Sequence, residues 1–354
     1  MHPYKGLSSR QFWSSAVGRT FIPSDIATVP SPLIRRGDRI VTAGSCFAAN
    51  LVPYLEANGL RYLRTEYQHP AFAKTAPEAM NYPTYSAAYG NVYTARQLYQ
   101  LLLRALGRFQ PQEDRWRSAG AIIDPFRPGM RYVARSEREF EVLTAQHLYA
   151  TRRAFESCDV FIMTLGTTEA WVSTRDGAVF PACPGTVAGT FDRKRHEFVN
   201  FTAAEVALDL GSFVTQLRAI NPHVRVILTV SPVPLVATAT PRHVMAANAY
   251  SKSALRVAAE AATREHDDVH YFPSYEIVIG PHAAAEFFEP DRRTVSKHAI
   301  DIVMAAFLAQ CEDAGSSAAD ETGPRASNAA AIQDVSKQII DDECEEAALD
   351  RSTL

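Results

Sequence analysis

The sequence predicts an α/β fold, a three-layer α/β/α sandwich with a central parallel sheet. Short β-branched runs alternate with longer segments of helical periodicity, which is the pattern of successive βαβ units. The two most apolar runs, 159–165 and 224–230, have the length of strands and the near-continuous hydrophobic character of strands buried on both faces. Strands of that kind occur mainly in parallel sheets covered by helices on both sides.

The predicted strands are short and bounded by turn residues. The first ends at Gly44 and the third at Gly166. A hairpin is expected over 171–183, because Asp176-Gly177 favours a tight turn. We expect strands of the main sheet at 39–43, 61–64, 159–165, 224–230 and 269–272.

The predicted helices combine apolar periodicity with recognisable ends. Asn58-Gly59 can stop the first helix, and Thr202 and Ser296 can cap the starts of two later ones by accepting backbone N–H groups. We expect helices at 48–57, 95–106, 203–220, 248–265 and 297–311.

Charge divides the 354-residue chain into two parts. The formal net charge is only −3, so nothing global indicates a nucleic acid partner or an anionic membrane. Residues 313–354 hold ten acidic and three basic side chains, whereas 1–312 hold 29 acidic and 33 basic ones. The sequence therefore predicts one domain, 1–312, followed by an acidic tail, 313–354, which we expect to be disordered because it has little apolar surface to bury.

Cysteine usage and hydropathy indicate the compartment. The chain lacks a CxxC motif or a Cys/His cluster, so neither a disulfide framework nor a zinc site is expected. The first residues lack the apolar stretch of a secretory signal, and no run approaches the roughly 18 apolar residues of a membrane span. We expect a cytoplasmic protein without metal or cofactor; its oligomeric state stays open. The five cysteines are Cys46, Cys158, Cys183, Cys311 and Cys344.

Ser45 is the candidate nucleophile. It follows the first strand and Gly44, at the carboxyl edge of a parallel sheet, where ligands bind in α/β folds. A serine at a helix N-terminus lies among free N–H groups that favour developing negative charge, but it still needs a base to remove its proton. The alternative is that Ser45 only caps the helix that follows.

Several motifs resemble those of the GSCFA family, which belongs to the SGNH/GDSL-like hydrolases. The similarity extends over roughly residues 1–310 and implies an SGNH/flavodoxin-like sandwich that hydrolyses or transfers acyl groups, often acetyl groups on carbohydrates. The matching segments are GSCFA at 44–48, YGNVYTARQL at 89–98, TLGTTEAW at 164–171, TVSPV at 229–233, YSKSALR at 250–256 and YFPSYEI at 271–277.

The resemblance also assigns roles around an oxyanion hole. Ser45 matches the family's serine, the backbone N–H of Gly90 would help to bind the oxyanion, and Asn91 could add a side-chain donor. An ordinary turn is the alternative for Gly90-Asn91. Thr168 stands where the superfamily pattern Gly-x-Asn-Asp has its oxyanion-binding asparagine, and a threonine hydroxyl is shorter than an amide.

The catalytic base is the part of the pattern that this sequence lacks. Thr294 occupies the histidine position of the superfamily's Asp-x-x-His motif, and threonine is no base at neutral pH. His243, expected in the loop after the fourth strand, is favoured as the replacement because such loops gather catalytic groups. His298 is the alternative base. Asp291 could orient the base, or it could pair with a neighbouring arginine.

Three further polar residues are weaker candidates for the site. Glu276 is a second carboxylate that could orient the base. Lys252 and Arg256 lie four apart on one predicted helix face and could meet an anionic substrate group, although a solvated face is the simpler expectation.

The sequence thus predicts a serine-dependent acyl ester hydrolase or O-acyltransferase whose substrate is a small molecule or glycan ester. The second hypothesis is a catalytically silent SGNH-type carbohydrate-binding module, because Thr168 and Thr294 replace residues that catalysis uses in the superfamily.

Overall fold

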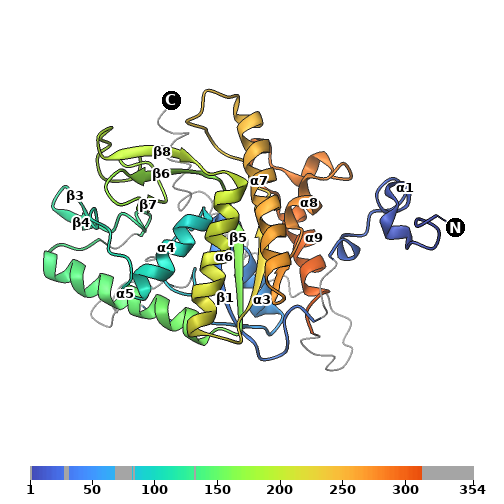
Figure 1. Ribbon diagram of the computed structural model, residues 1–354, viewed down its shortest axis with the longest axis horizontal. Helices are drawn as coiled ribbons and strands as arrows, with labels where there is room; N and C mark the ends of the chain where they lie inside the picture. Colours follow the sequence, from blue (N-terminus) through green and yellow to red (C-terminus); the bar gives the residue numbers. More distant parts are fainter. Residues whose placement is uncertain (1, 28–31, 68–81, 83, 131–132, 313–354) are drawn as a thin grey trace.

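The computed structural model describes residues 2–27, 32–67, 82, 84–130 and 133–312. The predicted acidic tail lies outside these residues. Five parallel strands form the main sheet in the order β10-β9-β5-β1-β2, which confirms the predicted α/β sandwich (Figure 1). The strands are β1 (Arg39–Gly44), β2 (Arg61–Tyr62), β5 (Val160–Leu165), β9 (Arg225–Val230) and β10 (Val269–Tyr271).

Helices cover both faces of this sheet, because alternate side chains of each strand point to opposite sides. Val41, Phe161 and Val226 belong to one apolar core, together with the helices of one face, whereas Ile40 and Ile162 belong to the other core, together with the helices of the opposite face. The first face carries α4 (Ala95–Ala105), α5 (Glu137–Ser157), α6 (Ala203–Ile220) and α7 (Val244–Glu265), and the second carries α2 (Cys46–Ala49), α3 (Leu51–Ala57), α8 (Ser274–Ile279) and α9 (Lys297–Leu308).

The strand order places a topological switch point between β1 and β5. From β1 the chain runs outward to the edge strand β2 and then returns to the other side of β1 as β5. The loops after β1 and β5 therefore diverge to opposite faces, which leaves a crevice beyond their carboxyl ends where ligands bind in such folds. Gly44 and Thr164 are direct neighbours at these ends.

A small antiparallel sheet lies beside the main one (Figure 1). It contains β6 (Glu169–Ser173), β7 (Val179–Phe180) and β8 (His196–Asn200) in the order β7-β6-β8. The hairpin predicted over 171–183 is confirmed, with Gly177 at a φ of +70° in its turn. The third strand, β8, was not predicted, because its sequence HEFVN has no strong alternation.

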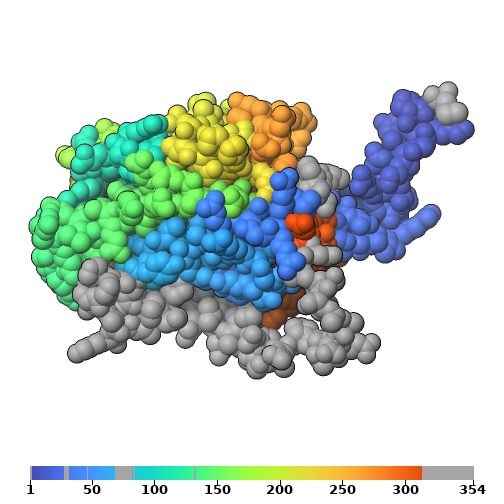
Figure 2. Space-filling model, turned by 90° about the horizontal axis from the view of Figure 1, so that it is seen from below, coloured from blue at the N-terminus to red at the C-terminus, as the bar shows by residue number. Residues whose placement is uncertain are grey.

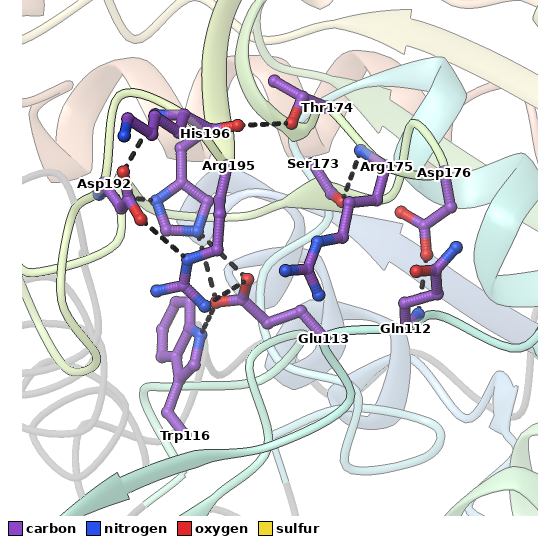
Figure 3. Close-up of polar contacts among 11 residues, drawn as sticks. Gln112, Glu113, Trp116, Ser173, Thr174, Arg175, Asp176, Asp192, Arg195 and His196 are labelled. Atoms are coloured by element: carbon purple, nitrogen blue, oxygen red, sulfur yellow. Dashed lines mark hydrogen bonds and ion pairs between the residues drawn. The ribbon is translucent and has the colours of Figure 1, made fainter.

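A buried polar cluster joins this sheet to the hairpin of β3 (Trp116–Ser118) and β4 (Ala121–Ile123). The backbone N–H of Asp192 donates to Nδ1 of His196, so the proton of the neutral ring lies on Nε2, which faces Glu113 at 3.2 Å. Glu113 also accepts from the Trp116 indole at 2.7 Å and from Arg195 (Figure 3). Because both ring nitrogens of His196 are occupied, we interpret this cluster as a structural clamp.

Neither α5 nor α8 was predicted. The buried stripe of α5 contains His147, Thr151 and two alanines, so it lacks the strong apolar periodicity of a core helix. The predicted helix at 48–57 is divided at Asn50 into α2 and α3, and the strand predicted at 61–64 ends at Tyr62. The predicted caps are confirmed: Thr202 accepts from Glu205 N–H and Ser296 from Ala299 N–H.

The N-terminal residues 2–20 project from the body of the molecule (Figure 2). They include the 3₁₀ turn Ser9–Gln11 and α1 (Trp13–Ala16), neither of which buries a residue. Two further 3₁₀ turns, Pro23–Asp25 and Ala285–Phe287, pack near α9. Within the described ranges, every helix is too short or too polar to cross a membrane.

Candidate functional site

The site is built where β1 and β5 end. A Cβ atom on Gly44 would lie 2.8 Å from the Thr164 Cβ and 2.9 Å from the Ala48 Cβ, and the φ of Gly44 is +152°. Only glycine fits this position without displacing β5 or α2. The close approach packs the start of α2 against β5 and places Ser45 directly at the switch point.

Ser45 is buried, with 5% of its surface exposed, and it occupies the N-cap position of α2. Its side chain nevertheless accepts no backbone N–H group, so the capping alternative does not explain this residue. Among the described residues, nothing forms a hydrogen bond with its Oγ atom. A buried polar atom without a partner is rare in folded proteins and calls for an explanation.

Two more buried polar atoms near this edge share that property. They are Oγ1 of Thr164, next to Gly44 on β5, and Oδ1 of Asn50, at the end of α2. We call Ser45, Asn50 and Thr164 the unpartnered trio. Each such atom costs on the order of 1–3 kcal/mol while it has no partner, and a hydrogen bond from a ligand or water would recover that cost.

The loop predicted to form the oxyanion hole lies between the two strand ends. Val92 N–H donates to the Gly44 carbonyl at 2.8 Å, and the carbonyl of Tyr93 accepts from Gly166 and Thr167 at 3.0 and 3.1 Å. Gly90 has a φ of +68°, which a glycine adopts without strain. The structure therefore brings residues 90–93 to the same edge as Ser45.

Asn91 and Thr168 are both fixed by neighbours. The Asn91 carboxamide oxygen accepts from the Tyr85 hydroxyl at 2.9 Å, which sets the orientation of the amide. The Thr168 hydroxyl donates to Oδ1 of Asn200 at 2.7 Å, and its N–H donates to Ser251 at 2.9 Å. Asn200, on β8, thus lies beside Thr168, and sequence spacing gave no sign of this contact.

The position of Lys252 contradicts the sequence prediction that it lies on a solvated helix face. Only 1% of its surface is exposed, and its Nζ atom donates to the Gly166 carbonyl at 2.7 Å. The expected solvated face of this helix instead turns toward the end of β5, because α7 lies against the sheet along its length. Arg256, one turn later, is half-buried and pairs with Glu276 at 3.2 Å and Glu260 at 3.0 Å.

The two candidate bases lie at the surface. His243 is the N-cap of α7, which begins at Val244 and not at 248 as predicted, and its Nδ1 accepts from Met245 N–H at 3.2 Å. His298 is exposed on α9, and its ring and that of Phe287 make a T-shaped contact. No described histidine forms a hydrogen bond with Ser45.

The two candidate orienting carboxylates have other partners. Asp291 accepts from the Thr294 hydroxyl at 2.6 Å and from two backbone N–H groups. Partial burial alone would raise the pKa of Asp291, but these bonds lower it, so the carboxylate closes a charged turn. Glu276 accepts from the Tyr271 hydroxyl at 2.9 Å and pairs with Arg256.

A cavity of about 230 Å³ opens at the same edge of the molecule. It lies between the loop at 93–94, the small sheet and the loop 235–239 that follows β9. Thr167, whose N–H donates to Tyr93, lies in its wall, whereas Ser45 does not line it. Among the described residues, no three His, Cys, Asp or Glu side chains are grouped so that they could hold a metal ion.

Comparison with known proteins places the chain in one family. The curated proteins include no match to it. A family model described as the GSCFA family matches residues 39–307, from the start of β1 into α9. This match covers most of the chain and contains Ser45, the loop at 90–93 and the whole main sheet, so the chain belongs to the GSCFA family.

Proposed function

We propose that this protein is a serine-dependent acyl ester hydrolase or O-acyltransferase of the SGNH/GDSL type, acting in the cytoplasm on a carbohydrate or glycan precursor. The observation that carries the proposal is the Ser45 hydroxyl. It lies at the switch point of the sheet, within the motif that names the family, and it is buried with no hydrogen-bond partner among the described residues.

In this reaction the Ser45 oxygen attacks the acyl carbonyl carbon and the alcohol leaves, which gives an acyl-enzyme. Water or a sugar hydroxyl then takes the acyl group from Ser45. The Gly90 N–H and the Asn91 amide are the proposed oxyanion donors, each worth about 3–4 kcal/mol to the transition state. Thr168 acts as a third oxyanion donor only when its hydroxyl no longer donates to Oδ1 of Asn200.

His243 is the proposed base, with His298 as the alternative and Asp291 as the orienting carboxylate. Catalytic hydrogen bonds often tighten only when substrate is bound, so we expect the base to approach Ser45 in the substrate complex. For His243 to act, its ring must leave the Met245 N–H that it now caps.

A fluorophosphonate probe tests the nucleophile directly. We expect the wild type to be labelled on Ser45, as identified by mass spectrometry of the peptide, and Ser45→Ala to be unlabelled. Ser274→Ala is the matched control, because Ser274 is also buried but its hydroxyl is hydrogen-bonded to Thr229 and to the Val230 carbonyl. Equal labelling of the wild type and Ser45→Ala would contradict the proposal.

Kinetics of the two histidine variants test the base. Loss of the base in a Ser–His pair lowers kcat/KM by several powers of ten. We expect this loss in His243→Ala and a change below about tenfold in His298→Ala. A small change in both variants would exclude both histidines.

The second candidate function is a carbohydrate-binding module without catalysis. It is favoured by the position of Thr294, which closes a turn with Asp291 where the superfamily has a catalytic histidine. A protein that resists the probe but binds an oligosaccharide in calorimetry would support this function instead.

A further inference from the structure

The cavity of about 230 Å³ has one strongly aromatic wall. In the small sheet, Trp171 of β6 is the direct neighbour of Phe180 on β7 and of Phe198 on β8, and all three side chains line the cavity. They therefore form a row across three strands, with Phe180 buried and the other two half-buried. We call this cavity the Trp171 pocket.

A polar edge adjoins the aromatic row. Glu169 lies two residues before Trp171 on the same strand, so both side chains point to the same face, and both line the pocket. The Thr238 hydroxyl, from the loop after β9, donates to a Glu169 oxygen at 2.7 Å. This bond fixes the carboxylate at the junction of the two walls.

This combination of groups selects among ligand classes. A carboxylate beside the aromatic row disfavours an alkyl chain, because an acyl tail would cover it without offering a hydrogen bond. The apolar walls equally disfavour a highly charged anion, which Glu169 would also repel. A saturated ring with C–H groups on one face and hydroxyl groups at its rim satisfies both parts, because the C–H groups contact the aromatic faces while hydroxyls donate to the carboxylate.

The volume of the cavity narrows the choice of ligand further. The cavity is smaller than the roughly 300–1,000 Å³ typical of pockets for drug-sized ligands. It therefore accommodates a single ring rather than an oligomer, and any further unit of the ligand must extend out of the opening.

We propose that the Trp171 pocket binds one pyranose ring, with the ring face on Trp171 and ring hydroxyls donating to Glu169. The ring is the recognised part of the substrate, and its ester substituent extends along the edge marked by Thr167 and Gly166 toward Ser45. This last step rests on the proposed function, whereas ring binding does not.

The chain's three tryptophans make the binding measurable. Trp13 is 69% exposed on the N-terminal projection, Trp116 is buried in the clamp, and only Trp171 lines the pocket. Titration with methyl glucoside, methyl galactoside and methyl N-acetylglucosaminide should give a saturable change in emission with at least one of them. The change should disappear in Trp171→Phe and persist in Trp13→Phe.

Calorimetry with the same glycosides tests the carboxylate. Glu169→Gln keeps the size of the side chain and removes the charge, so we expect affinity to fall by about tenfold or more. Ser45→Ala should bind as the wild type does. Thermal unfolding of each variant verifies that it is folded, and Glu169→Gln serves as the test if Trp171→Phe does not fold.

Two outcomes would overturn the inference. One is the absence of saturable binding of all three glycosides to the wild type, and the other is equal binding by the wild type, Glu169→Gln and Trp171→Phe. Labelling of Ser45 by the fluorophosphonate probe together with either outcome would leave the proposed function standing. Ring binding without labelling would contradict only the enzyme proposal.

Discussion

Glu66 and Ser45 are both buried polar residues near the loop at 90–93, but their surroundings are opposite. Glu66 accepts from His147 at 2.8 Å and from Ala88 N–H at 2.7 Å, and it pairs with Arg127 at 3.4 Å. Ser45 and the rest of the unpartnered trio have no such bonds within the described part of the chain.

The cluster around Glu66 is close to electrically neutral. Its carboxylates, Glu66 and Asp124, face the guanidinium groups of Arg127 and Arg104, with Arg127 3.1 Å from Asp124. Burial, and then the charge of Arg127, lower the pKa of His147, so its ring is neutral at pH 7. Arg127 also contacts the Ala88 carbonyl, so the cluster fixes the segment that leads to Gly90.

The difference distinguishes buried polar groups that stabilise the fold from buried polar groups that are available to a ligand. Buried polar groups with all their bonds made hold a fold in one conformation, and removing one member leaves the others unpaired. Buried groups without partners cost stability in the free protein and gain their bonds from something bound. The comparison therefore predicts opposite responses to mutation in the two regions.

Removal of Arg127 should have the largest effect on stability. In Arg127→Met both Glu66 and Asp124 lose their closest guanidinium, and breaking such a buried pair costs about 3–5 kcal/mol. The midpoint of urea unfolding measures this loss. Arg117→Met is the control, because the Arg117 side chain is 67% exposed in its pair with Glu137 and should change stability by less than about 1 kcal/mol. Equal small losses in both would refute the comparison.

Acid should weaken the same cluster. Burial alone would raise the pKa of Glu66, but His147 and Arg127 lower it from 4.5 to about 2. A lowered pKa gives stability that is complete above pH 4.5 and is lost as the pH falls toward 2, by on the order of 3 kcal/mol. The urea midpoint should therefore differ between the wild type and Glu66→Gln at pH 7, and much less at pH 2.5. A difference that stays constant with pH would disprove this assignment.

A mutation in the unpartnered trio should change stability the least, and it should raise stability rather than lower it. Thr164→Val removes a buried hydroxyl that has no partner in the described part of the chain, so we expect unchanged stability or a gain of up to about 1 kcal/mol. Thr229, its direct neighbour on β9, is the matched control, because its hydroxyl is hydrogen-bonded to Ser274. Thr229→Val should lose about 1 kcal/mol. Calorimetric unfolding distinguishes the two, and a larger loss in Thr164→Val would exclude our interpretation of the trio.

The sequence by itself determined the five parallel strands, the caps Thr202 and Ser296, the hairpin at Gly177 and the position of Ser45 after β1. These features depend on local information: the apolar character of short runs, the side chains that accept backbone N–H groups, and the turn that Asp-Gly favours. The family match at 39–307 has the same origin, because it too is a property of residue order.

Only the tertiary structure decided the surroundings of the site. Lys252 reaches the Gly166 carbonyl across 86 positions and Asn200 meets Thr168 across 32, so neither contact leaves a trace in local periodicity. The Trp171 pocket likewise requires three strands in one register and a loop that follows β9. Such contacts depend on which elements pack together, and that choice is made by the free energy of the whole fold rather than by any one segment.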